Sequence, residues 1–392
     1  MSITELPLPD EHALTHSLAL QEVIRDQIKD NEGHISFSRF MQMALYEPGL
    51  GYYSAGAIKF GESGDFTTAP EISPLFSICL ARQCAEVMNE LDQPMILELG
   101  AGTGVLASDL LKELQNLNSL PIKYYILEPG ADLRQRQQDL LLARIPELMS
   151  KVCWLDALPE DGFEGLILAN EVLDAMPVQR FRLGKKKIEE LHVEWKEDGF
   201  AWGRYDANDE LTQKIENIIQ DSTTSFDDGY TSEINGNLPA WIKSMSDCLR
   251  RGVMLFVDYG YSRHEYYHEQ RSQGTLICHY RHRAQSDPFL YVGLQDISAS
   301  VDFTAVAEAA VSAKLSVSGF TTQAYFLMAC GLEQIMHERK DMSQIQQLEF
   351  SRQIKLLTLP GEMGERFKVI ALSRDIETEL AGFSLIDHRR RL

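Results

Sequence analysis

The stretch from Pro94 to Gly104, with the sequence PMILELGAGTG, constrains the fold more than any other part of this chain. Its apolar run at residues 95–99 has the length of a buried strand, and Gly100 and Gly102 follow at once. Glycine lets the backbone turn tightly and approach a ligand, and the start of a following helix offers unpaired N–H groups. The sequence therefore predicts a strand, a ligand-binding turn and a helix in direct succession.

The chain beyond residue 94 alternates short apolar strands with helices, which is typical of an α/β fold with a covered parallel sheet. Helices precede this core, and an insertion at about residues 177–250 interrupts it. We expect a first region at 1–92, with helices and a long Gly-rich loop, and a core region at 93–392. The expected core strands are 95–99, 123–127, 152–155, 165–169, 253–257 and 367–372; the expected helices are 12–30, 36–45, 73–91, 103–116, 130–143, 171–176, 303–314 and 321–357; the insertion holds strands at 179–183, 188–195 and 200–204 and helices at 209–221 and 239–250.

The composition places limits on partners and location. The 392 residues carry a net charge of −21, which disfavours nucleic-acid binding because phosphates need a basic surface. The six cysteines are scattered without a C-x-x-C pair, as expected for reduced thiols in the cytoplasm. The first residues lack the basic character of a signal or transit peptide, and no apolar run approaches the ~20 residues that a membrane span needs. The basic tail at 388–391 indicates a solvated terminus in preference to a docking site.

Polar side chains follow the predicted core strands at their carboxyl ends, where ligands bind in doubly wound sheets. Four of the five strands before residue 260 deliver an acid or an amide to this edge, and the remaining strand delivers the glycine turn. Each acid alone is unremarkable, but together they describe a site. The residues are Glu128, Asp156, Asn170, Glu171, Asp174 and Asp258.

Glu98, directly before the glycine turn, indicates which ligand binds there. A carboxylate suits a ligand with a cationic amino group, such as S-adenosylmethionine (SAM), and disfavours a diphosphate. The spacing agrees, because the third glycine of a dinucleotide motif would stand at Val105 and here comes one residue earlier, at Gly104. The segment also lacks the Lys and Ser/Thr of a P-loop. We therefore expect SAM, held by Glu98, Gly100, Gly102 and Gly104, in preference to NAD.

The remaining polar residues suggest roles around such a cofactor. Glu128 is placed to accept both ribose hydroxyls, or else to cap the helix at 130–143. Asp156 is placed to accept a bond from the adenine amine, or to cap a turn. Asn170 and Glu171 stand where a methyl acceptor meets the sulfonium, where an amide can hold the acceptor and a carboxylate can take its proton; the alternative is a capped short helix.

Two other chemistries lack support in the sequence. His264 and His268 are four residues apart, and Cys278, His279 and His282 cluster, but neither group belongs to an H-E-x-x-H motif or to paired C-x-x-C motifs. We therefore expect no metal site. A G-x-S-x-G motif is also absent, which argues against a serine hydrolase.

Several further motifs occur along the chain: Gly51-Tyr52-Tyr53-Ser54, Phe60-Gly61, Gly64-Asp65-Phe66, Thr68-Ala69-Pro70-Glu71-Ile72-Ser73, Glu98 to Gly104, Asp109-Leu110-Leu111, Asn170 to Val178, Asp258-Tyr259-Gly260, Gly274-Thr275-Leu276, Val301-Asp302-Phe303-Thr304 and Gly319-Phe320 with Gln323 and Phe326-Leu327. Together they resemble the MidA family of class I SAM-dependent methyltransferases. The mitochondrial relatives of this family are protein-arginine methyltransferases that assist respiratory complex I assembly. The resemblance covers roughly residues 35–335, and its N-terminal signature is its most specific part.

The resemblance implies a Rossmann-like core with an N-terminal helical element and an inserted α+β cap. It implies that Gly64, Asp65 and Thr68 belong to a segment that folds over the cofactor. It also implies a protein substrate, with arginine favoured, whose guanidinium Glu171 and Asp174 would hold by paired bonds. A SAM-binding assembly factor with little catalysis and a small-molecule O- or N-methyltransferase are the alternatives.

One position departs from the family pattern. Residues 296–300 read Asp-Ile-Ser-Ala-Ser, where the family has a histidine at the position of Ser300. This change puts an acceptor-handling role at that position in doubt. The oligomeric state is not indicated by the sequence.

Overall fold

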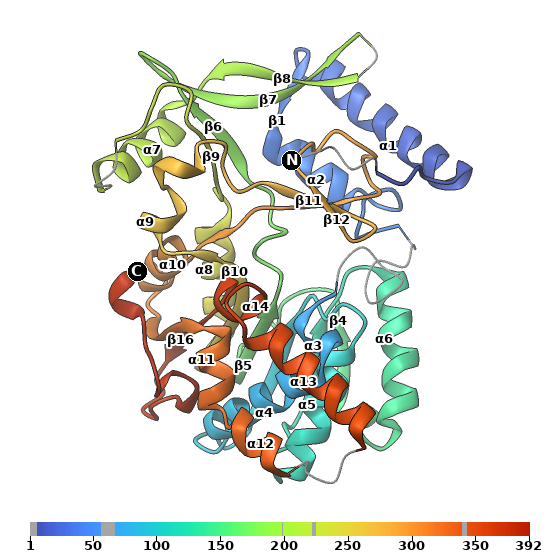
Figure 1. Cartoon of the computed structure of the whole chain (residues 1–392), viewed down its shortest axis with the longest axis vertical. Coiled ribbons are helices and arrows are strands. Elements are labelled where there is room, and N and C mark those ends of the chain that lie inside the picture. Colours follow the sequence, from blue (N-terminus) through green and yellow to red (C-terminus); the bar gives the residue numbers. More distant parts are fainter. Residues whose placement is uncertain (1–5, 56–66, 198, 222–224, 339–342) are drawn as a thin grey trace. The chain divides into compact units, whose positions relative to one another are not determined.

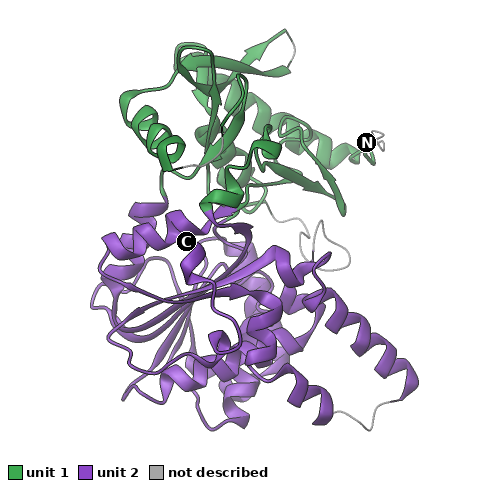
Figure 2. Cartoon of the chain, turned by 60° about the vertical axis from the view of Figure 1, so that its left-hand side comes forward, with its two compact units in different colours: residues 1–66, 174–237, 263–300 green, residues 67–173, 238–262, 301–392 purple. Residues whose placement is uncertain are grey.

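The computed structural model describes residues 6–55, 67–197, 199–221, 225–338 and 343–392 (Figure 1). The chain forms two compact units, each built from separate stretches of sequence (Figure 2). Unit 1 comprises 1–66, 174–237 and 263–300, and unit 2 comprises 67–173, 238–262 and 301–392. This partition differs from the predicted division at residue 92, because residues 67–92 belong with the core and the insertion begins at 174.

Unit 2 contains an eight-stranded sheet with the order β15-β16-β10-β5-β2-β3-β4, and β14 pairs with β10. The strands β10, β5, β2, β3 and β4 are mutually parallel, whereas β16 runs antiparallel to β10 and to β15. The chain order reverses between β2 and β5, which creates the crevice where doubly wound sheets bind ligands. The strands are β2 (Met95–Leu99), β3 (Tyr124–Leu127), β4 (Val152–Leu155), β5 (Phe163–Asn170), β10 (Leu249–Tyr261), β14 (Val301–Asp302), β15 (Ser316–Thr322) and β16 (Phe367–Arg374).

The helices of unit 2 bury apolar faces against this sheet. Helices α4 and α5 pack together on it, and α8 packs with α10 (Figure 1). Fully buried side chains from helices and strands, such as Phe76, Leu110 and Leu166, form one continuous core. The helices are α3 (Ala69–Ile72), α4 (Pro74–Met88), α5 (Val105–Asn116), α6 (Ala131–Arg144), α8 (Leu238–Cys248), α10 (Phe303–Ser312), α11 (Gln323–Ala329), α12 (Leu332–Glu338), α13 (Gln344–Thr358) and α14 (Met363–Arg366), with short 3-10 helices at Pro146–Lys151, Ala381–Phe383 and Arg389–Arg391.

Unit 1 is built on antiparallel sheets. A five-stranded sheet has the order β1-β7-β6-β9, with β8 also paired to β7, and a three-stranded sheet has the order β12-β11-β13. A separate core that includes Phe37, Phe40 and Val193 lies within this unit. The elements are α1 (Glu11–Asp30), β1 (His34–Ser36), α2 (Phe37–Tyr46), β6 (Gln179–Leu183), β7 (Ile188–Lys196), β8 (Gly199–Asp206), α7 (Asp209–Asp221), β9 (Thr231–Ile234), α9 (Arg263–Tyr266), a 3-10 helix at Glu269–Arg271, β11 (Ile277–Tyr280), β12 (Arg283–Gln285) and β13 (Asp296–Ser298).

Two predicted helices are wrong. Residues 171–176 form bends and turns, because the left-handed backbone of Glu171, with φ of +54°, does not fit a right-handed helix; the N–H groups of Val172 and Leu173 donate to the carboxylate of Asp258 (3.2 and 2.9 Å). The helix predicted at 321–357 is broken into α11, α12 and α13. Gly331, with φ of +87°, ends α11, because a left-handed residue cannot continue a right-handed helix. The segment before it, β15, is a strand that the sequence analysis missed.

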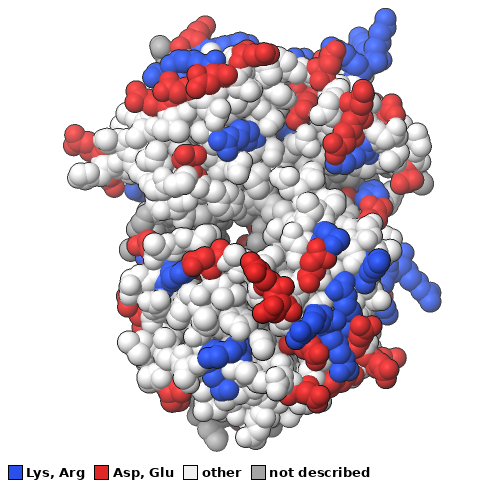
Figure 3. Space-filling view, turned by 180° about the vertical axis from the view of Figure 1, so that it is seen from behind, with Lys and Arg blue, Asp and Glu red and all other residues white. Residues whose placement is uncertain are grey.

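The surface carries both signs of charge. Figure 3 shows Lys and Arg side chains interspersed with Asp and Glu on one face, and the acidic excess gives the net charge of −21. Within the described stretches of the chain, no helix combines the length and the apolar character that a membrane crossing requires. All six cysteines are free thiols.

Candidate cofactor site in unit 2

The glycine turn between β2 and α5 has the backbone geometry that only glycine adopts readily. The φ angles of Gly100, Gly102 and Gly104 are +62°, +54° and +87°. A Cβ atom at Gly100 would also lie 3.0 Å from Cγ2 of Val172. Gly104 occupies the N-cap position of α5 and supplies no side-chain cap, so the first N–H groups of this helix are left for a ligand.

Glu98, at the end of β2, is a buried carboxylate that forms no ion pair with the residues that the structure describes. The residue is 2% exposed, and its Oε2 accepts a hydrogen bond of 2.8 Å from the Tyr124 hydroxyl. Burial raises the pKa of Glu98 to about 7, although the bond from Tyr124 acts to lower it, and no cationic side chain among the described residues lowers it further. A ligand ammonium group would supply the missing positive charge.

Glu128, which follows β3, is held by two donors. Its Oε1 accepts from the backbone N–H of Gly130 (2.9 Å), and its Oε2 accepts from Nε2 of Gln137 (3.2 Å). The N-cap position of α6 is Gly130, so Glu128 is not the N-cap residue itself. The fixed, buried carboxylate has acceptor positions suited to ribose hydroxyls.

Asp156, which follows β4, lies at the rim of the sheet. Its side chain is 87% exposed and forms an ion pair of 2.6 Å with Nη2 of Arg134. Both residues line a cavity of about 250 Å³, together with Pro129 and neighbouring residues on α6. The carboxylate of Asp156, which we predicted to contact the adenine amine, therefore also forms a salt bridge with Arg134.

Asn170 and Glu171 lie at the end of β5. Nδ2 of Asn170 donates to Oε1 of Glu171 (3.2 Å), and Oδ1 of Asn170 is buried without a hydrogen-bond partner among the described residues. Glu171 has a φ of +54°, which is strained for a residue with a side chain, and its N–H donates to the carbonyl of Val257 (2.9 Å). Backbone strain of this kind is concentrated at functional sites.

The other predicted site residues are distributed as follows. Thr68 stands at the N-cap position of α3 without a side-chain cap bond. Asp174 is buried and belongs to unit 1, where its carbonyl accepts the N–H of Ala299 (3.0 Å). Gly64 and Asp65 lie outside the described residues. Ser300 belongs to unit 1, where its N–H donates to Oγ1 of Thr275 (3.1 Å).

Sequence reasoning missed two side chains that support this site. Tyr124 is the buried donor to Glu98, and Gln137 is the buried donor to Glu128. Gln137 does leave a signal in the sequence, because it falls midway between Leu133 and Leu141 in the buried stripe of α6. A polar residue in an apolar stripe indicates a specific hydrogen-bonding partner.

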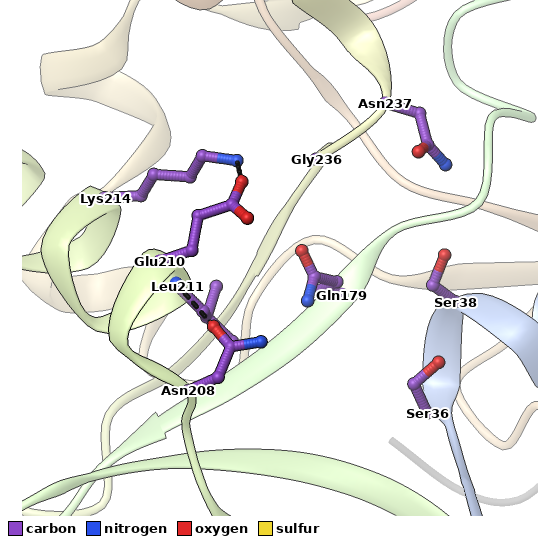
Figure 4. Close-up of a pocket in the computed structure, with 9 residues that line it drawn as sticks. All are labelled: Ser36, Ser38, Gln179, Asn208, Glu210, Leu211, Lys214, Gly236 and Asn237. Atoms are coloured by element: carbon purple, nitrogen blue, oxygen red, sulfur yellow. Dashed lines mark hydrogen bonds and ion pairs between the residues drawn. The ribbon is translucent and has the colours of Figure 1, made fainter.

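Unit 1 has a separate polar pocket of about 290 Å³ (Figure 4). The carboxamides of Gln179 and Asn237 and the hydroxyl of Ser38 line it, and Lys214 forms an ion pair of 2.7 Å with Glu210 at its edge. Asn208 also lines the pocket, but its Oδ1 accepts the N–H of Leu211 (2.8 Å) and so caps α7. The walls of this pocket offer mainly uncharged hydrogen-bond donors and acceptors.

The residues of unit 2 fit SAM on three observations. Within the described part of the chain, a buried carboxylate lacks a cation, a helix start without a side-chain cap follows three glycines of positive φ, and the amide oxygen of Asn170 lacks a partner. These groups surround the point where the strand order reverses. The fold and the site are those of a Rossmann-like SAM-dependent methyltransferase.

Comparison with known proteins agrees with this class. A family profile described as "Putative S-adenosyl-L-methionine-dependent methyltransferase" matches residues 79–321, and the chain belongs to this family. A COG1565 superfamily protein from Burkholderia thailandensis, crystallised with S-adenosyl-homocysteine, is similar over 99% of this chain and 100% of its own, with 42% identity and a TM-score of 0.93.

Relatives with named activities are more distant. The mitochondrial protein arginine methyltransferase NDUFAF7 homolog of Caenorhabditis elegans is 26% identical over 387 residues, which cover 90% of this chain and 86% of the relative. The Xenopus laevis protein arginine methyltransferase NDUFAF7 is 24% identical, with the same coverage. The chain is therefore a SAM-dependent methyltransferase whose named relatives act on arginine.

Proposed function

We propose that this enzyme methylates an arginine side chain of a protein in the cytoplasm. The named relatives support this substrate, because they are protein arginine methyltransferases that match most of the chain. The single observation that carries the assignment is the pair Asn170 and Glu171, an amide oxygen without a partner in the described residues beside a carboxylate on a strained backbone. The six unpaired thiols favour a reducing compartment.

Binding of SAM uses the groups at the strand ends. Glu98 pairs with the ammonium group of the amino-acid tail, and the N–H groups of the turn after Gly100 face its carboxylate. Glu128 accepts bonds from the ribose hydroxyls, and Asp156 accepts one from the adenine amine. Thr68, at the N-cap position of α3, belongs to the segment that covers the cofactor. Bound SAM supplies an activated methyl group on a sulfonium, so the protein's task is chiefly positioning.

The acceptor side of the site must hold a guanidinium and remove a proton from it. Glu171 holds the planar cation by charge-assisted bonds, and Oδ1 of Asn170 accepts one of its N–H groups. The proton that leaves the methylated nitrogen passes to the carboxylate of Glu171. The N–H of Ala69 (3.4 Å) and Nδ2 of Asn170 (3.2 Å) donate to Oε1 of Glu171 and orient this carboxylate, and a general base must lie within hydrogen-bond reach of the proton it takes.

Incubation of the purified protein with methyl-labelled SAM and a cell lysate tests this function. We expect label in a protein band and methylarginine in its hydrolysate. Label confined to small metabolites would show a small-molecule methyltransferase. Co-purification with a partner in the absence of any label would show an assembly factor. Either result would overturn the proposal.

The Glu171→Gln variant tests the proposed base. We expect methyl transfer to be lost while the affinity for S-adenosyl-homocysteine stays within a few-fold of wild type. Glu164→Gln is the matched control, because Glu164 is on the same strand, β5, at the far end from the site. Full turnover by Glu171→Gln would contradict the assignment of the base.

A further inference from the structure

Gln137, on helix α6, connects two loops and a strand at the cofactor edge of the sheet. Its Nε2 donates to the carbonyl of Gly102 (3.0 Å) and to Oε2 of Glu128 (3.2 Å). Its Oε1 accepts from Nε1 of Trp154 (2.9 Å). Gly102 follows β2, Glu128 follows β3 and Trp154 is on β4, so one buried carboxamide joins three neighbouring strands.

A carboxamide is the side chain that this position requires. Two donated bonds and one accepted bond satisfy both amide hydrogens and engage the oxygen, and the residue is 0% exposed. A glutamate would lose the donors and place a second carboxylate against Glu128. A methionine would keep the volume and lose every bond. Helix α6 also lies close to the turn, because a Cβ at Gly104 would be 3.4 Å from Cα of Gln137.

Arg134, one helical turn before Gln137, fastens the same strand ends from outside. Its Nη2 donates to the carbonyls of Glu128 (2.8 Å) and Leu155 (3.2 Å) and pairs with Asp156 (2.6 Å). Arg134 and Gln137 therefore hold the main chain and the side chain of Glu128 from one helix. In all of these contacts the two side chains bond to residues outside α6, at the ligand-binding edge of the sheet.

We propose that Gln137 is a positioning residue that sets the direction of the Glu128 carboxylate and of the Gly102 peptide, and so gives the site its preference for a ribose. This inference rests on the proposed function, in which Glu128 binds the ribose hydroxyls. Two hydroxyls on adjacent carbons demand a fixed carboxylate, because a rotating one satisfies only one of them at a time. Gln137 removes that rotation at Oε2 while Gly130 removes it at Oε1.

The test measures ligand affinity and ribose discrimination in the full-length protein. Calorimetry gives the Kd of S-adenosyl-homocysteine, and competition gives the ratio of the affinities for adenosine and 2′-deoxyadenosine. For Gln137→Glu and Gln137→Met we expect the Kd to rise about tenfold to a hundredfold and the ratio to fall toward one. A merely structural glutamine would lower the melting temperature and leave this ratio unchanged, and that result would overturn the inference.

Further variants separate the positioning role of Gln137 from the proposed ribose-binding role of Glu128. Glu128→Gln should lower the ribose ratio by itself; if it does not, the ribose role of Glu128 is wrong. If Glu128→Gln lowers the ratio and the folded Gln137 variants do not, the positioning role is wrong. Trp154→Phe keeps an aromatic side chain, removes the donor to Oε1 together with part of the ring volume, and should lower the ratio less. If the Gln137 variants do not fold, an unchanged ratio in Trp154→Phe would overturn the inference. Gln115→Glu, on exposed α5 surface, is the charge control.

Discussion

The hydroxyl of Tyr124 donates a hydrogen bond of 2.8 Å to Oε2 of Glu98, and both side chains are buried on neighbouring parallel strands. One neutral donor does not replace the hydration that an ionised carboxylate loses on burial. The pKa of Glu98 is accordingly raised to about 7 by burial. The protein thus keeps at its cofactor edge a carboxyl group whose ionisation a bound cation favours.

The first prediction concerns stability without cofactor. Because the pKa of Glu98 rises from 4.5 to about 7 on folding, the folded state binds more protons than the unfolded state between these values. The free energy of unfolding should therefore fall as the pH rises from about 5 to 8, and Glu98→Gln should remove this fall. This fall in the free energy of unfolding of the wild-type protein between pH 5 and pH 8 is at most about 3 kcal/mol. Urea unfolding at both pH values measures it, and an equal pH dependence in the variant would contradict it.

The second prediction concerns the affinity for the cofactor. A cationic amino group binds the ionised form of Glu98, so the affinity for S-adenosyl-homocysteine should increase as Glu98 loses its proton. We expect the Kd at pH 6 to be about tenfold weaker than at pH 8, and the Glu98→Gln variant to bind weakly at both. Calorimetry at the two pH values decides. A wild-type Kd that does not change between them would refute the pairing.

The strands and the glycine turn were predictable because their signals are local. Met95–Leu99 was predicted with its observed limits, since a short apolar run that ends at a glycine indicates a buried strand from the local sequence alone. The helix predicted at 171–176 was wrong, because Glu171 has a left-handed backbone that a right-handed helix cannot contain, and a residue with a side chain rarely adopts it. Likewise, β15 forms a strand because it pairs with β16, and the residues of β15 alone do not indicate that pairing.

The candidate site was predictable to the same degree. Acids after parallel strands indicated Glu98 and Glu128, because strand direction alone brings those ends to one edge. The partners Tyr124 and Gln137 were not predicted, since a side chain's neighbour across a sheet or from a helix depends on packing. The ion pair of Asp156 with Arg134 was missed for the same reason.

The third prediction concerns a buried ion pair in unit 1. Glu233 is 0% exposed and pairs with Nε of Arg180 at 3.3 Å, while the N–H of Thr275 donates to Oε2 (2.7 Å). Burial raises the pKa of Glu233 above its ordinary value, and Arg180 acts against this rise. Arg180→Met would leave the carboxylate buried without a cation and should cost about 3–5 kcal/mol at neutral pH.

The loss in Arg180→Met should be smaller at pH 5 than at pH 8, because a protonated Glu233 needs no cation. Chemical denaturation of wild type and variant at the two pH values gives the difference. Lys243→Met, which breaks an exposed pair with Asp247 on α8, is the control and should leave the stability nearly unchanged. Equal stability of Arg180→Met and wild type at pH 8 would show that the pair does not stabilise the fold.

The fourth prediction concerns the strain at Glu171, whose φ is +54°. Glycine adopts this conformation freely, whereas a residue with a Cβ pays about 1 kcal/mol or more for it. Glu171→Gly and Glu171→Ala both lack the carboxylate, so the difference between them isolates the backbone. We expect the glycine variant to be more stable than the alanine variant by about 1 kcal/mol in urea unfolding. Neither variant should transfer methyl groups, since each lacks the proposed base. If the alanine variant proves as stable as the glycine variant, the backbone at this position is not strained.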